Sequence, residues 1–232
     1  MDDAYLAALR ADVCPPPGPH PPLVGQSWAL EELASLLEEA LALLRGAGIA
    51  VDSYPVDHVC FRSASADEYS DASRNAERSG ARCLVESMIG GRPISTYELE
   101  EPIVIGPRSI RLLELSVGRR PLFLYSFSRG DLVGRPAPKP GRHYETGWEH
   151  AEIALGDDLE KVADFLRTGD HGLAVDWRAW KKEVNRDVSI SCPRGFSIKL
   201  HAAPLDEVVA MEKAEGLVVP VPPDYWEDRA RK

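Results

Sequence analysis

The sequence lacks an excess of basic residues and has no long apolar runs. Among 232 residues, Lys and Arg number 27 and Asp and Glu 37, giving a formal net charge of −10 at pH 7. Nucleic acids and anionic membranes attract basic surfaces, so neither is expected as a partner. No apolar run approaches the roughly 18 residues of a membrane span, and the N-terminus MDDAYLAALRADV lacks the pattern of a secretory signal. We therefore expect a soluble, cytoplasmic protein, a monomer or homodimer, that binds a small molecule.

Closely spaced cysteines are also lacking. The four cysteines stand at positions 14, 60, 83 and 192 and form no C-x-x-C pair. This spacing indicates neither a zinc knuckle nor a disulfide framework. We expect all four to be reduced.

Proline is concentrated near the start of the chain. The stretch CPPPGPHPP (14–22) fits neither a helix nor a central strand, so residues 1–26 are expected to form an extended Pro-rich segment. From Ser27, a suitable N-cap, leucines recur at helical spacing until Gly46, which predicts a helix packed on the body of the fold. A short helix is predicted over 204–216, and residues 217–232 are expected to form an extended tail.

Between these ends the same order of elements is predicted twice. Residues 55–118 contain a strand (VDHVCFR), a polar helix and three further strand-like runs, and residues 147–203 repeat this order from WEHAEIAL onward. The Pro/Gly-rich stretch 134–147 connects the two halves. We therefore predict an α+β fold in which residues 27–216 form one domain. Its paired βαβββ modules would form a curved, mostly antiparallel sheet around a concave site, with the N-terminal helix added.

The first and last strands of each module alternate between an apolar and a titratable face. In the first module His58 lies on the titratable face of the first strand, and Glu114 on that of the last. In the second module His150 and Glu152 lie on the titratable face of the first strand, and His201 on that of the last. If the modules pair about a pseudo-twofold axis, the titratable faces line one concavity.

This arrangement predicts a metal site formed by His58, Glu114 and His150. Two imidazoles and one carboxylate leave positions open for substrate and suit Fe²⁺, Zn²⁺, Ni²⁺ or Mn²⁺. Adding His201 gives a more closed site, better suited to an isomerase or lyase. The alternative is a solvated sheet face, since one face of an antiparallel sheet commonly meets water.

Other residues near this face are candidates for chemistry or substrate binding. Glu152 is a candidate general acid or base, or a residue that orients a ligand. Arg62 and Lys199 are candidates for binding an anionic substrate, and Arg92, beside a glycine turn, for bordering the pocket. For each, a solvated side chain or a structural ion pair is the simpler alternative.

Five motifs in this order resemble the YecM family, over residues 30–216: DHVCFR, IGGRPISTYELEEPI, LLELSV, GWEHAEIAL and SIKLHAAPLDEVVAMEKAEG. The resemblance implies membership of the vicinal oxygen chelate superfamily, with glyoxalase I and the extradiol dioxygenases. Members of that superfamily are built from paired βαβββ modules. In glyoxalase-like members a metal ligand lies on the first and last strand of each module.

Carried over to this sequence, the resemblance implies His58, Glu114 and His150 as ligands. The fourth position departs from the pattern: Lys199 stands where a glutamate is expected, and a protonated lysine is no metal ligand. His201, two residues later on the same face, is the optional fourth ligand.

The function hypotheses follow from these residues and the resemblance together. The first is a metal-dependent enzyme acting on a small oxygenated, anionic substrate, with Glu152 as acid or base. An Fe²⁺ oxygenase would consume oxygen, whereas an isomerase or lyase would work anaerobically. The second is a non-catalytic protein that binds a small ligand or a metal. The third is a structural or regulatory protein with a vestigial site, for which Lys199 is the main argument.

Overall fold

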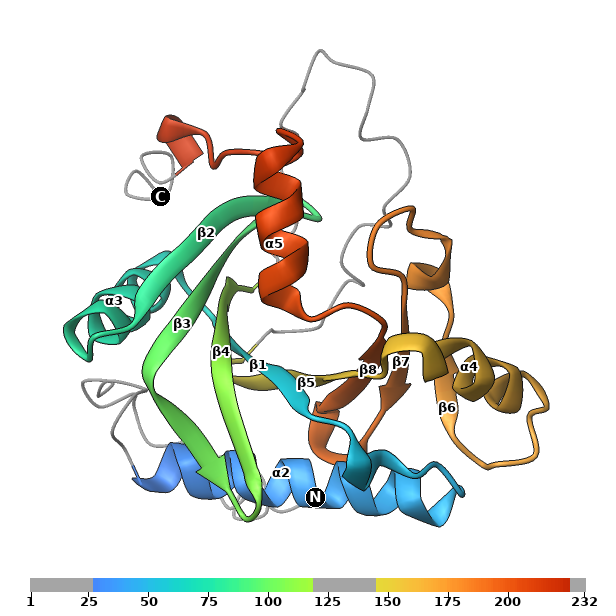
Figure 1. Cartoon of the computed structure of the whole chain (residues 1–232). Coiled ribbons are helices and arrows are strands. Elements are labelled where there is room, and N and C mark those ends of the chain that lie inside the picture. Colours follow the sequence, from blue (N-terminus) through green and yellow to red (C-terminus); the bar gives the residue numbers. More distant parts are fainter. Residues whose placement is uncertain (1–26, 119–144, 226–232) are drawn as a thin grey trace, which may run out of the picture.

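The computed structural model describes residues 27–118 and 145–225 (Figure 1). The Pro-rich segment expected over 1–26, most of the connector expected over 134–147, and residues 226–232 of the tail lie outside the described residues. Among the described residues, no helix has the length and apolar character needed to cross a membrane.

Two modules with the same order of elements follow an initial helix, α2 (Ser27–Gly46). The first module consists of β1 (Val56–Ser63), α3 (Ala66–Arg78), β2 (Arg82–Ile89), β3 (Arg92–Ile105) and β4 (Arg108–Val117). The second consists of β5 (Gly147–Ala154), α4 (Leu159–Arg167), β6 (Ala174–Asp176), β7 (Asp187–Ser191) and β8 (Ser197–His201). Helix α5 (Leu205–Ala214) follows the second module. The prediction of paired βαβββ modules is therefore confirmed.

The strands form one open, eight-stranded sheet in the order β2-β3-β4-β1-β5-β8-β7-β6. Within each module the first strand pairs in parallel with the last, as β1 with β4 and β5 with β8. All other neighbours are antiparallel, including β1 and β5 at the centre of the sheet. The two first strands, which carry the predicted histidines, are thus adjacent although they lie far apart in the sequence.

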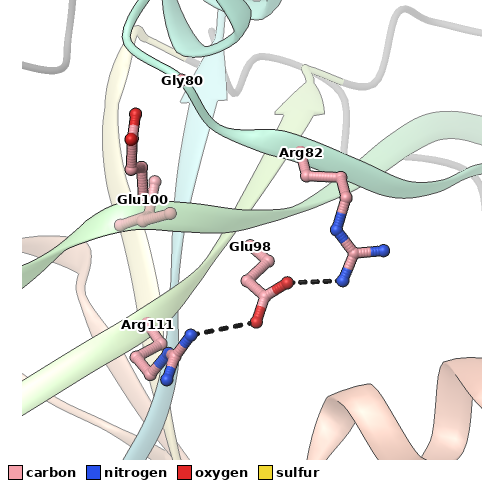
Figure 2. A pocket seen from close by; sticks show the side chains of 6 residues that line it. Gly80, Arg82, Glu98, Glu100 and Arg111 are labelled. Carbon is pink, nitrogen blue, oxygen red and sulfur yellow. Dashed lines mark hydrogen bonds and ion pairs between the residues drawn. The ribbon is translucent and has the colours of Figure 1, made fainter.

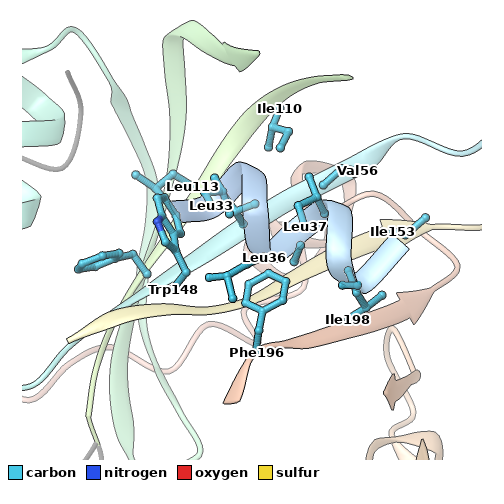
Figure 3. Packing of buried hydrophobic residues seen from close by; sticks show 14 of the residues in the cluster. Leu33, Leu36, Leu37, Val56, Ile110, Leu113, Trp148, Ile153, Phe196 and Ile198 are labelled. Atoms are coloured by element: carbon cyan, nitrogen blue, oxygen red, sulfur yellow. The ribbon is translucent and has the colours of Figure 1, made fainter. Parts of the chain in front are cut away.

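Helix α2 covers the apolar face of the sheet where the two modules meet (Figure 3). Its leucines recur every three or four residues, so one side of the helix is apolar and faces the core. Leu33 and Leu37 have no exposed surface and belong to the same cluster as Val56, Leu113 and Ile198 of both modules. Because this helix packs on strands from both modules, its burial holds the modules together. It covers one face of the sheet, so the polar side chains of the strands lie on the other face.

Two β-bulges interrupt the pairing of β1 with β5. His58 pairs with Glu152 and Val56 with Ile153, which leaves Asp57 as an extra residue; Cys60 pairs with His150 and Phe61 with Trp148, which leaves Glu149 as another. A bulge turns the side chains that follow it to the opposite face of the strand. An acidic bulge residue therefore precedes the histidine in each module.

Helix α3 is followed two residues later by a glycine whose substitution should destabilise the fold. Gly80 has a φ of +82° and donates its N–H to the Glu77 carbonyl at 3.0 Å. An alanine in this left-handed conformation costs about 1–2 kcal/mol. An added Cβ would also push aside the Glu100 side chain, so we expect Gly80→Ala to lower the free energy of unfolding by at least that amount in urea denaturation.

Gly46→Ala is the matched control for this change. Gly46 ends α2 without a positive φ, and a Cβ added there meets no atom within 4 Å. The control should leave stability unchanged or raise it by up to about 1 kcal/mol, because alanine favours helix. Equal effects of the two substitutions would rule out backbone strain at Gly80.

Candidate metal centre

Four buried side chains from three strands converge on the polar face of the sheet, two histidines and two carboxylates. Their potential ligand atoms all lie within 4.8 Å of one another, and the residues are His58, Glu114, His150 and Glu152. The register explains the convergence, because His58 lies directly opposite Glu152, while Cys60 pairs with both Glu114 and His150. The structure thus brings together the three residues that the sequence predicts as ligands. Glu152, the candidate acid or base, lies in the same cluster.

The two imidazoles face the two carboxylates across short distances. The Nε2 atom of His58 lies 3.7 Å from Oε2 of Glu114 and 3.4 Å from Oε1 of Glu152. For His150 Nε2 the corresponding distances are 3.5 and 3.2 Å. Ligand atoms that share a first-row divalent ion, with bonds of about 2.0–2.2 Å, lie roughly 3–3.5 Å apart. The donor set and its spacing therefore fit such an ion.

Asp57, the first bulge residue, orients His58. Its Oδ2 lies 2.8 Å from Nδ1 of His58 and also accepts the backbone N–H of Leu205, at the start of α5, at 3.1 Å. Because a carboxylate accepts hydrogen bonds, Nδ1 carries the proton and Nε2 is left to face the cluster. This Nε2 is buried and has no hydrogen-bond partner, which is the state expected of an atom placed to bind a cation.

The acidic surroundings shift the pKa values of the cluster. Burial by itself would lower the pKa of His58, but the Glu152 and Glu114 carboxylates outweigh it and raise that pKa to about 10. Burial would raise the pKa of Glu114, yet the positive charge of His58 and the contact with His150 lower it to about 2. The pKa of Glu152 falls well below its usual range despite burial, because Lys199 and His58 stabilise the carboxylate. The carboxylates are therefore ionised at neutral pH, and the His58 imidazolium and the Lys199 ammonium are the positive charges that a bound metal ion would replace.

Lys199 on β8 extends directly into this group. It pairs across the sheet with Glu152, and its ammonium group forms an ion pair with Oε1 of that residue. The same Nζ lies 3.0 Å from Nε2 of His150. Of the predicted substrate-binding residues, Lys199 is thus the one that contacts the candidate ligands.

His201 lies at the edge of the cluster and belongs to a second possible group of ligands with Asp57 and His58. Its Nδ1 donates to the Ala203 carbonyl at 2.8 Å, so Nε2 is the free ring nitrogen. This Nε2 is buried without a hydrogen-bond partner, 3.6 Å from Oδ2 of Asp57 and 3.7 Å from Oε2 of Glu152. His201 therefore lies near Oε2 of Glu152, whereas His150 lies near Oε1 of the same carboxylate.

Arg92 and Arg62 meet around Glu149, the second bulge residue. Arg92 donates to both carboxylate oxygens of Glu149, at 3.0 and 3.1 Å, and to the Ser116 hydroxyl at 3.3 Å. Arg62 lies 3.7 Å from the same carboxylate and donates to the Glu145 carbonyl at 3.1 Å. The Arg92 pair keeps the pKa of Glu149 below its usual range despite burial. Both predicted substrate-binding arginines are therefore engaged by the protein itself.

A separate, open depression of about 360 Å³ lies over the β2–β3–β4 side (Figure 2). Three of its charged residues are paired with one another, because Glu98 forms ion pairs with Arg82 and Arg111. No residue of the metal-ligand cluster lines it. We therefore assign no site to this depression.

Sequence reasoning missed Asp57 and Glu149 as members of the site. Strict alternation from His58 and His150 places both acids on the apolar face, and only the bulges bring them to the polar one. One signal was present: an acidic residue directly precedes the histidine in both modules, as Asp57–His58 and Glu149–His150.

Comparisons with known proteins agree with the resemblance seen in the sequence. Residues 26–212 match the family model of the YecM protein. Protein YecM of Escherichia coli (strain K12) is 26% identical over 202 residues, which cover 80% of this chain and 95% of that protein. Among solved structures, the structural-genomics protein EC4020 is 25% identical with a TM-score of 0.55, covering 84% of this chain and 100% of that chain. A methylmalonyl-CoA epimerase from Mycobacterium tuberculosis is more distant, at 16% identity and a TM-score of 0.39 over 65% of this chain and 89% of that chain. The chain matches the YecM model over most of its length and belongs to the YecM family.

Proposed function

We propose that this protein is a divalent-metal-dependent enzyme of the vicinal oxygen chelate type that acts on a small, oxygenated, anionic substrate. One observation carries the proposal: the buried Nε2 of His58, without a hydrogen-bond partner, faces the carboxylates of Glu114 and Glu152. Such a group is stable only with a proton or a metal ion between its members. The nitrogen and oxygen donors suit Fe²⁺, Zn²⁺, Ni²⁺ or Mn²⁺.

His58, Glu114 and His150 would hold the ion, and His201 or Glu152 would supply a fourth ligand. When bound, the ion would supply Lewis acidity toward substrate oxygens or, as Fe²⁺, a site for dioxygen chemistry. Asp57 keeps His58 in the tautomer that presents Nε2. These residues come from rigid strands, so the ligand set is held in place before anything binds.

Glu152 is the residue that we assign to proton transfer. Its Oε1 is held by Lys199, His150 and His58 at one end of the cluster. If a substrate displaced Lys199 from it, the basicity of this carboxylate would rise, because the ammonium is the main cause of its low pKa. The Lys199 ammonium would then be available to an anionic group of the substrate.

A non-catalytic metal- or ligand-binding protein is the second candidate, and the position of Lys199 favours it. The ammonium contacts His150 and Glu152 and so places a positive charge among the candidate ligands. A site with a lysine in place of one metal ligand could still bind a metal ion or a small ligand without catalysing a reaction.

Chelation of a substrate can be tested with oxalate as a probe. Its vicinal oxygens imitate the proposed substrate class, and Co²⁺ in a mixed nitrogen–oxygen site reports changes of ligand in its visible spectrum. We expect the spectrum of the Co²⁺-loaded protein to change on titration with oxalate and to saturate at about one oxalate per ion.

Acetate, which lacks vicinal oxygens, is the control and should perturb the spectrum much more weakly. Desalting the sample afterwards and measuring its cobalt shows whether oxalate has bound the ion in place or removed it. Retained cobalt with a spectrum that oxalate does not alter would mean a closed site and would contradict the enzyme proposal.

A further inference from the structure

Lys199 uses the same acceptor atoms that a metal ion would use. Its Nζ lies 3.0 Å from Nε2 of His150 and forms an ion pair with Oε1 of Glu152. Those two acceptor atoms are themselves 3.2 Å apart. The lone pair of an imidazole nitrogen binds one partner at a time, so it serves either the ammonium or a metal ion. The two cations therefore compete for His150.

The ammonium also compensates charge that would otherwise be costly to bury. Glu114 and Glu152 are both buried and lie close to the same imidazole nitrogens. Ionised groups removed from water need a partner of opposite charge. Lys199 supplies that charge from within the chain.

Lys199 can leave the cluster more readily than its partners can. Its side chain keeps 26% of its surface exposed, whereas that of Glu152 keeps 10% and that of His150 3%. A lysine ammonium sits on a flexible four-carbon stem, so it can move to solvent while the backbone of β8 stays paired. Of these three residues, Lys199 is therefore the one whose side chain borders solvent most.

We propose that Lys199 is a displaceable internal cation, which holds the ligand cluster together until a divalent ion binds and must then release His150 and Glu152. The proposal rests on the metal-binding role proposed above and adds a determinant of affinity to it. Metal binding is weakened by the free energy needed to move the ammonium out. Removal of the ammonium should therefore strengthen metal binding.

The test is the affinity for Zn²⁺, measured by competition with a chromophoric chelator. We expect Lys199→Met to bind Zn²⁺ about tenfold more tightly than the wild type. Lys199→Gln, a polar neutral replacement, should show the same direction and serves if Lys199→Met does not fold. In wild-type protein with ¹³C-labelled lysine, the Lys199 Cε signal, identified by its loss in the variant, should shift when Zn²⁺ is added.

Lys182→Met is the matched control. It removes the same charge from an exposed lysine of the second module that pairs with Asp187 at 2.6 Å, outside the cluster. We expect its Zn²⁺ affinity to stay within about twofold of the wild type. Lys199 variants that bind Zn²⁺ as weakly as the wild type, or more weakly, would overturn the proposal while leaving the metal site itself intact. Equal tightening by Lys182→Met would also overturn it, and absence of Zn²⁺ binding in all variants would instead contradict the proposed function.

Discussion

Substitution of His150 or Glu114 by alanine is expected to weaken Zn²⁺ binding by at least about 100-fold, a larger loss than removal of a residue that merely orients a ligand. Each change deletes one nitrogen or oxygen donor from a cluster in which the distances between imidazole and carboxylate are 3.2–3.7 Å. The buried neighbours of the deleted group cannot replace it, because they are fixed on paired strands. Isothermal titration calorimetry or chelator competition measures the loss.

His171→Ala is the control for the histidine substitution. His171 lies outside the cluster, where one ring nitrogen contacts the Leu166 carbonyl and the other accepts the backbone N–H of Leu173. Its removal should leave Zn²⁺ affinity unchanged. Unaltered affinity in both His150→Ala and Glu114→Ala, with folding verified by circular dichroism, would show that the ligands are assigned wrongly.

Trp148→Ala is expected to lower the free energy of unfolding by about 3–5 kcal/mol. Trp148 is 7% exposed, and its ring packs edge-on against that of Phe61 with 5.3 Å between the ring centroids. Its indole N–H donates to the Ala29 carbonyl of α2 at 2.8 Å. It therefore joins the central strand β5 to the helix that spans both modules. A domain with a typical stability of about 5–15 kcal/mol would lose a large share of it.

Trp148→Phe separates packing from the hydrogen bond. Phenylalanine keeps most of the aromatic packing but lacks the N–H donor, so we expect a loss of about 1–2 kcal/mol. Urea denaturation of the three proteins gives both values. If Trp148→Ala changed stability by less than about 1 kcal/mol, the contact between α2 and the sheet would not be important for stability.

The fold was largely predictable from the sequence because its strands alternate between apolar and polar residues over most of their length. His58, Val59 and Cys60 point alternately, so the polar face of β1 can be assigned without knowing its neighbours. The order of strands and helices in each module follows from the spacing of apolar residues, which changes between every second residue in strands and every three or four residues in helices. That the two modules pair about a pseudo-twofold axis was a condition of the predicted site, and no local signal indicated that β1 and β5 are the neighbouring strands.

The bulges were not predictable, because a bulge depends on how two strands pair. Counting back from His150 by strict alternation places Trp148 on the polar face, yet the extra residue Glu149 returns Trp148 to the side of α2. The contact of Arg92 with Glu149 was hidden for a similar reason. It joins the start of β3 to β5 of the other module, 57 residues away in the sequence.

The fourth position of the site shows the limit of matching residues to a pattern. The sequence has a lysine where the family resemblance implied a ligand, but it did not tell whether the ammonium points into the cluster or to solvent. In the structure Lys199 points inward and contacts His150 and Glu152. A cation in this place changes the expected affinity of the site without removing its other ligands.

The metal content of the wild-type protein tests the central claim most directly. The protein is purified without chelators, incubated anaerobically with Fe²⁺ or aerobically with Zn²⁺, desalted, and analysed for metal by mass spectrometry. We predict about one tightly held ion per chain, bound in competition with protons at His58, so that occupancy falls as the pH is lowered. A protein that retains no metal after desalting and binds none on titration would contradict the proposed metal centre.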